Sequence, residues 1–159
     1  MPKKQSTILS NFDILDLCKH LNIPIVDVLS KDQLPSHKIK GLFVINLGDF
    51  ATGGTHWTCF STIPKNEFYF DSYGAPPPIE VDKYIKRTTG KKKYFVNKIQ
   101  LQAISATYCG WFAVAVLYLM QHLPGSVAKR MDKITDWLNS DDLHDNYDKL
   151  LSFFQKVLP

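Results

Sequence analysis

Cys109 stands where a thiol becomes reactive. It follows the irregular stretch Ala103–Tyr108 and precedes a long apolar run, so we expect it at the first turn of a helix. The positive end of the helix dipole lowers the pKa of a thiol and favours the nucleophilic thiolate. The backbone N–H of Cys109, unpaired at the helix start, can donate to a developing oxyanion. Gln102 offers a second amide donor, and Gly110 leaves room for a substrate backbone.

His56 and Asp71 flank two β-rich runs, Trp57–Thr62 and Phe68–Ser72, which we expect to form a hairpin. With the four-residue loop Thr62–Lys65, His56 lies directly opposite Asp71. Opposed residues have Cβ atoms about 4.5–5.5 Å apart, a distance at which a carboxylate can hold an imidazole. A base, an orienting acid, a nucleophile and oxyanion donors are therefore all available by residue type.

The elements that must position these side chains follow from apolar spacing. His56 and Asp71 share one face of the expected hairpin. The other face is apolar, which predicts that it packs on the core and buries Cys59. Strands in the middle of the chain and helices at both ends predict an α+β fold. The expected elements are a helix with Asn11 as N-cap that Pro24 closes, a turn over Ser30–Pro35, strands over Leu42–Ile45 and Lys93–Ile99, and helices over Val81–Arg87, Cys109–His122, Ser126–Asn139 and Asp145–Leu158.

Length and composition are those of one globular domain spanning residues 1–159, with 45% hydrophobic and 21% charged residues. Three cysteines without a CxxC pair predict neither a disulfide framework nor a zinc site, and point to a reducing compartment; Cys18 and Cys59 are expected to be structural. We expect no metal. The start of the chain lacks the apolar core of a signal peptide, and the run Trp111–Met120 is too short to cross a bilayer. The net charge of +4 permits contact with a polyanion.

Three sequence blocks resemble the adenovirus-type maturation cysteine protease (adenain), a family in the clan of ubiquitin-like-protein proteases. The seven-residue step from Gln102 to Cys109 is similar to the adenain spacing, and the resemblance covers roughly residues 9–122. Upstream residues are similar to the versions carried by virophages and Polinton/Maverick elements. The three blocks are Gly54-Thr55-His56-Trp57, Phe70-Asp71-Ser72-Tyr73-Gly74 and Gln102 with Cys109-Gly110; the upstream residues are Leu9-Ser10-Asn11, Asp32-Gln33-Leu34-Pro35 and Asn46.

The resemblance implies a papain-like fold in rearranged order, with a central mixed sheet flanked by helices and the nucleophile at the start of a buried helix. It also implies an endopeptidase that cleaves capsid or other precursor proteins during virion maturation, after a glycine. By this resemblance Cys109 is the nucleophile, His56 the base, Asp71 the residue that orients His56, and Gln102 the oxyanion donor. Trp57, Gly110 and Gly54 would bind substrate or support the site.

Some positions depart from the family pattern. Asp71 stands where adenain has Glu, Ser105 where Asn is usual, and Tyr108 where a small or acidic residue is usual. Gln100 lies two residues from Gln102 and is the alternative oxyanion donor. Two other functions remain open: an isopeptidase acting on SUMO or ubiquitin with the same triad, and a nucleic-acid-binding domain without enzymatic activity.

A basic run lies between Tyr84 and Tyr94 and is typical of a solvated loop. Because adenain uses viral DNA as a cofactor, the resemblance implies activation by DNA bound at this run. Adenain also takes an activating peptide joined through a disulfide; no matching cysteine can be placed here, so this requirement is not carried over, and activation by DNA or by a peptide stays open. The chemistry itself needs no cofactor, and we expect a monomer without membrane contact in the virion and the infected-cell cytoplasm. The basic residues are Lys86, Arg87, Lys91, Lys92 and Lys93.

Overall fold

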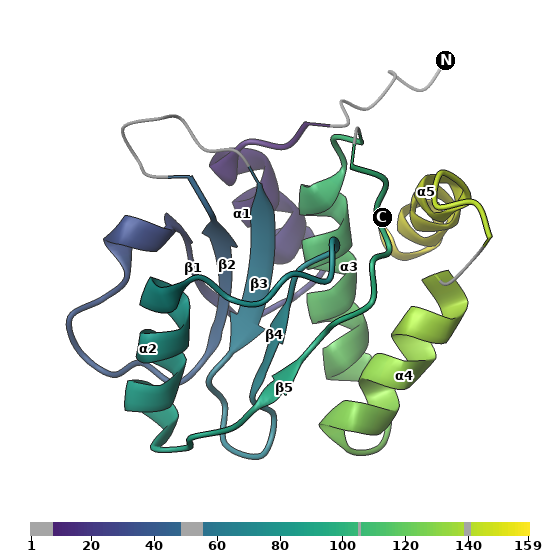
Figure 1. Ribbon diagram of the computed structural model, residues 1–159. Helices are drawn as coiled ribbons and strands as arrows, with labels where there is room; N and C mark the ends of the chain where they lie inside the picture. The colour runs from purple at the N-terminus through teal and green to yellow at the C-terminus, as the bar shows by residue number, and fades with distance from the viewer. Residues whose placement is uncertain (1–7, 49–55, 105, 139–140) are drawn as a thin grey trace.

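The protein folds around a mixed five-stranded sheet whose strands lie in chain order (Figure 1). The computed structural model describes residues 8–48, 56–104, 106–138 and 141–159. The outer pairs β1–β2 and β4–β5 are parallel, whereas β2–β3 and β3–β4 are antiparallel. The predicted α+β fold with a central mixed sheet is confirmed. The strands are β1 Ile25–Ser30, β2 Leu42–Asn46, β3 Trp57–Ser61, β4 Phe68–Phe70 and β5 Phe95–Val96.

Helices cover both faces of this sheet. Four helices share a core with one face, and α2 packs with the other face (Figure 1). The helices are α1 Asn11–His20, α2 Ile79–Thr89, α3 Cys109–His122, α4 Val127–Leu138 and α5 Asp145–Val157, with a short 3₁₀ turn, η1, at Lys31–Gln33. Among the described residues, no helix combines the length and the apolar character that crossing a membrane requires.

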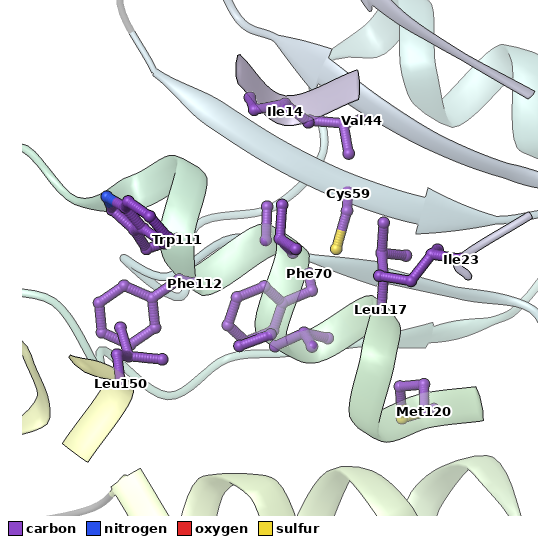
Figure 2. Packing of buried hydrophobic residues seen from close by; sticks show 14 of the residues in the cluster. Ile14, Ile23, Val44, Cys59, Phe70, Trp111, Phe112, Leu117, Met120 and Leu150 are labelled. Carbon is purple, nitrogen blue, oxygen red and sulfur yellow. The ribbon is translucent and has the colours of Figure 1, made fainter. Parts of the chain in front are cut away.

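Helix α3 lies at the centre of the larger core. Phe112 and Leu117 are almost fully buried, and both belong to the cluster that contains Cys59 and Phe70 of the sheet (Figure 2). Side chains from α1, α4 and α5 complete this cluster. Because the sheet and three helices surround α3, its sequence is apolar on every side, as the run Cys109–His122 predicts.

The first helix begins one residue earlier than expected. Ser10, and not Asn11, is the N-cap: its hydroxyl accepts the Asp13 N–H, and the Asp13 carboxylate accepts the Ser10 N–H at 2.8 Å. This reciprocal pair satisfies two backbone donors at once, which a lone Asn11 cap would not do. The helix then ends at His20, before Pro24.

Strand β1 is absent from the expected elements. It lies at the edge of the sheet and pairs in parallel only with β2, so its side chains do not alternate cleanly between core and solvent. Val26 and Asp27 are both exposed, while Val28 is buried. The β-branched residues of this stretch carried the signal for a strand, but the preceding helix and Pro24 obscured it.

The hairpin register differs by two residues from the expected one. Ser61 pairs with Phe68, so the loop runs from Thr62 to Glu67 instead of Thr62–Lys65. The buried Glu67 carboxylate accepts the Lys65 N–H at 2.6 Å and thereby keeps Glu67 in the loop. Because side chains alternate along a strand, a two-residue shift preserves both faces of the hairpin. His56 and Asp71 are therefore diagonal neighbours and not directly opposed residues.

Removing the ring at the centre of the core should be costly. We expect Phe112→Ala, at a site that is 0% exposed, to lower the free energy of unfolding by about 3–5 kcal/mol because it leaves a cavity. Phe12→Ala, at a site that is 75% exposed, should change this free energy by less than about 0.5 kcal/mol. Denaturant unfolding of both variants tests the core, and equal losses would contradict the placement of α3.

Candidate active site

Cys109 is the first residue of α3 and is half-buried. Its sulfur accepts a hydrogen bond from the backbone N–H of Trp57, with 3.4 Å between nitrogen and Sγ. The preceding residue, Tyr108, occupies the N-cap position without a side-chain capping bond. The thiol therefore lies at the positive end of the helix dipole and beside a backbone donor from the sheet, as the sequence predicts for a reactive cysteine.

His56 lies immediately before β3 and joins Cys109 to Asp71. Its Nε2 lies 2.8 Å from Asp71 Oδ1, and the Asp71 carboxyl is only 1% exposed. The imidazole is also hydrogen-bonded to Cys109, which leaves Nδ1 as the nitrogen that meets the thiol. The structure thus brings the three predicted side chains together in the order thiol, imidazole, carboxylate.

The two pKa shifts favour an ion pair. Burial raises the pKa of the Cys109 thiol, but the hydrogen bond and charge of His56 and the backbone N–H groups of Trp57 and Gly110 outweigh burial and hold this pKa below its ordinary value. Burial lowers the pKa of His56, yet hydrogen bonds and charges from Asp71 and Cys109 raise it to about 9. At neutral pH the two shifts favour a thiolate beside an imidazolium.

The turn after β4 fixes Asp71. Its Oδ1 accepts the Tyr73 N–H at 2.8 Å in addition to His56. Its carbonyl accepts the Gly74 N–H and the side-chain amide of Asn97. Gly74 has φ 73°, and a Cβ there would lie 2.8 Å from the backbone of Lys98, so only glycine fits this turn.

Gln102 lies in the loop that precedes Cys109 and is fully buried. Its Oε1 accepts the hydroxyl of Ser72 at 2.6 Å, and its Nε2 donates to the Ala106 carbonyl at 3.0 Å. Gln100 is exposed, and its amide donates to the backbone of Gln102. Gln102 is thus tied to the residue after Asp71 and to the loop before Cys109, and its role as oxyanion donor stays a prediction.

Trp57 and Gly110 support the site from the side of the N-terminal segment. The indole Nε1 of Trp57 donates to the Leu9 carbonyl at 2.9 Å. A Cβ at Gly110 would lie 3.1–3.3 Å from Leu9 and Trp57, so this glycine lets both pack against the start of α3. Gly110 is buried and Trp57 borders the cleft. Gly54 lies outside the described residues.

A cleft of about 720 Å³ opens above these side chains. Cys109, His56 and Trp57 line one part of it, and the segment before α1 and the end of β1 line the other. An opening of this size beside a half-exposed thiol can hold a short stretch of extended polypeptide. Within the described ranges, no group of three or more His, Cys, Asp or Glu side chains is arranged to hold a metal ion.

The predicted basic run lies away from this cleft. Asp71 follows the end of β4, and the stretch Lys91–Lys93 precedes the start of the parallel strand β5, so the two lie at opposite ends of these neighbouring strands (Figure 1). Lys91 Nζ lies 2.6 Å from the Glu67 carboxylate, Lys86 pairs with Asp82 at 3.0 Å, and Arg87 donates to the Pro35 carbonyl. DNA binding by this run stays a prediction.

Two contributors to the site are absent from the predicted set. Tyr73 stacks on the imidazole of His56, and Leu9 accepts the Trp57 indole N–H. Tyr73 stands inside the block Phe70–Gly74, two residues after Asp71, so its nearness to the site was available from the sequence. The contact of Leu9 depends on tertiary packing and had no local signal.

The fold has counterparts among solved structures. The ASFV pS273R protease matches with a TM-score of 0.51 and 17% sequence identity, over 78% of this chain and 61% of the other. A selenomethionine form of the ASFV pS273R protease matches with a TM-score of 0.49 and 16% identity, over 89% of this chain and 71% of the other. This chain therefore spans about three-fifths of the length of the first neighbour. No protein-family model and no curated protein matches the sequence. The likeness shows a shared fold.

Alkylation by iodoacetamide should reveal the ion pair. We expect Cys109 to be alkylated at pH values well below the ordinary thiol pKa of about 8.5, because the pKa of its thiol is lowered. The thiolate–imidazolium form should persist until His56 loses its proton near pH 9. In His56→Ala the dominant remaining influence is burial, which raises the thiol pKa, so the alkylation rate at pH 6 should fall by at least about tenfold.

Mass spectrometry of the labelled peptides supplies an internal control. Cys18 and Cys59 are fully buried, and burial raises the pKa of Cys18 to about 12, so both should stay unlabelled in the folded protein. A Cys109 that reacts no faster than a free thiol, with or without His56, would contradict the assigned pair.

Proposed function

We propose that this chain is a cysteine endopeptidase. The observation that carries the proposal is the hydrogen-bonded row Cys109, His56 and Asp71. Cys109 and His56 line an open cleft, Asp71 is buried behind His56, and both pKa shifts are directed toward a thiolate–imidazolium pair. The shared fold with a protease is consistent with this activity. The resemblance of three sequence blocks to adenain supports the same reaction.

In the proposed reaction, the Cys109 sulfur forms a bond to the carbonyl carbon of the scissile peptide, and the carbonyl oxygen becomes an oxyanion. The backbone N–H of Cys109 and the amide of Gln102 would stabilise this oxyanion. The imidazolium of His56 gives its proton to the leaving amine as the carbon–nitrogen bond breaks. Asp71 accepts the Nε2 proton in a hydrogen bond and keeps the imidazole in the required orientation.

The second half of the reaction regenerates the enzyme. His56, now neutral, takes a proton from a water molecule that attacks the thioester carbon. The carbon–sulfur bond breaks, the acyl group leaves as a carboxylic acid, and the sulfur departs as a thiolate. The imidazolium formed in this step restores the starting ion pair. Atoms and protons balance without a metal or an organic cofactor.

We propose capsid or related precursor proteins as the substrates, cut after glycine during virion maturation in the infected cell. This assignment rests on the similarity of the motif blocks to adenain and to the versions in virophages and Polinton/Maverick elements. An isopeptidase that removes SUMO or ubiquitin would use the same triad. The two functions differ in substrate, so one panel of substrates separates them.

The panel contains capsid precursors, peptides with glycine before the bond, matched peptides with leucine there, and modifier fusions. We expect cleavage of precursors and glycine peptides, and a loss of at least about 10⁴-fold in Cys109→Ala because the nucleophile is gone. Cys18→Ala serves as the matched control, since this buried thiol lies outside the cleft and should leave the cleavage rate unchanged. Cleavage of modifier fusions alone would favour the isopeptidase, and cleavage of no substrate would count against a peptidase.

DNA is proposed as an activator at the basic run, and Lys92 and Lys93 are exposed residues at its C-terminal end. We expect duplex DNA to bind with an affinity that falls steeply with salt, and the double variant Lys92→Gln with Lys93→Gln to weaken binding and lower the salt dependence. Lys19→Gln with Lys133→Gln, on exposed positions of α1 and α4, controls for net charge. Equal weakening by both double variants would contradict a localised DNA site.

A further inference from the structure

Tyr73 is not one of the three side chains Cys109, His56 and Asp71, but it contacts His56, Asp71 and the loop before Cys109. Its ring stacks on the imidazole of His56, with ring centroids 4.4 Å apart and 16° between the planes. Its backbone N–H donates to the same Asp71 oxygen that holds His56. Its hydroxyl donates to the Ile104 carbonyl, 3.2 Å away, in the loop that leads to Cys109.

We propose that Tyr73 is a positioning residue that holds the imidazole of His56 in the plane where it meets both Cys109 and Asp71. The proposal rests on the proposed function and adds a residue to it. The terminal torsion of histidine, about its Cβ–Cγ bond, is broad, so hydrogen bonds at the two ring nitrogens must hold the imidazole against this rotation. A ring packed flat against one face of the imidazole opposes the same rotation, because turning the imidazole would drive it into the packed ring.

The stack also favours the charge that the reaction needs. The face of an aromatic ring carries negative potential, and a cation over this face is attracted to it. The imidazolium of His56 gains this attraction, whereas the neutral imidazole does not. Tyr73 therefore stabilises the protonated base of the starting ion pair.

The contacts of Tyr73 also keep its own ring in place. The hydroxyl bond to the Ile104 carbonyl and the backbone bond to Asp71 fix the ring from two sides. The titratable groups that act on Tyr73 are Cys109 and Asp71, together with the stacked His56, and Tyr108 lies near enough for Tyr73 to affect its pKa. Burial is the largest cause that raises the pKa of Tyr73, so the phenol is neutral at the pH of the reaction.

The chain contains a matched control for this stack. Tyr118 stacks on His122 with ring centroids 4.0 Å apart and 18° between the planes, near the other end of α3. Tyr118→Leu removes a tyrosine–histidine stack of similar geometry from a place that does not touch the cleft. Any effect that follows from the loss of packing alone should appear in this variant too.

The experiment compares wild type with Tyr73→Leu, Tyr73→Phe and Tyr118→Leu by the pH profile of Cys109 alkylation. We expect Tyr73→Leu to move the low-pH limb of this profile toward higher pH, so that its alkylation rate at pH 6 is about tenfold lower. Tyr73→Phe keeps the ring and should keep the wild-type limb, and Tyr118→Leu should also keep it. The pKa of His56, followed by NMR, should fall in Tyr73→Leu alone.

The outcomes separate the two proposals. If Tyr73→Leu shows the same low-pH limb as the wild type, the role of Tyr73 is overturned and the endopeptidase proposal still stands. Equal losses in Tyr73→Leu and Tyr118→Leu, or in Tyr73→Leu and Tyr73→Phe, would also overturn it, because packing or the hydroxyl would then be responsible. A wild-type profile without a low-pH limb would remove the ion pair and both proposals with it. Thermal unfolding of each variant establishes that the folded protein is being compared.

Discussion

The contact between Cys109 and the start of β3 is the interaction on which the site depends. The sulfur meets the Trp57 N–H and the imidazole of His56, residues more than fifty positions away in the sequence. Such a contact holds only if the end of a helix and the end of a strand are both fixed. The burial of α3 between the sheet and three helices supplies this fixation, because a helix that is apolar on every side has no alternative exposed position. Its first residue alone borders the cleft.

Consecutive residues of the segment Asp71–Gly74 hold different side chains of the site in place. Asp71 holds His56, Ser72 holds the amide of Gln102, and Tyr73 covers the imidazole. Gly74 permits the turn that brings these three side chains to different partners. The imidazole of His56 and the loop before Cys109 are therefore positioned by one short turn, whose backbone Asn97 also fixes. A displacement of this turn would disturb all of these partners together, so the site is cooperative in its assembly.

The sequence was most informative where the signal is local. The apolar run after Cys109 predicts α3 and places the thiol at its first residue, and alternation along the hairpin places His56 and Asp71 on one face. The loop length was not predictable, because it depends on the buried Glu67 carboxylate, which pairs with Lys91 twenty-four residues away. The burial of Gln102 depends in the same way on Ser72, thirty residues away. The edge strand β1 lacks the burial contrast that makes a strand recognisable.

The direction of the strands separates the cleft from the basic run. β4 runs toward Asp71, and β5 lies parallel to it, so Lys92 and Lys93, which precede β5, lie at the ends of these strands remote from Asp71. At the proposed site, a polyanion bound at these lysines would leave the cleft free, so substrate and DNA would not compete for one surface. Any effect of such binding on catalysis must then pass through the sheet. β4 is the direct route, because the strand that pairs with β5 ends at the carboxylate that holds His56. Activation by DNA bound there would act on the orientation of the His56 imidazole and not on access to the thiol.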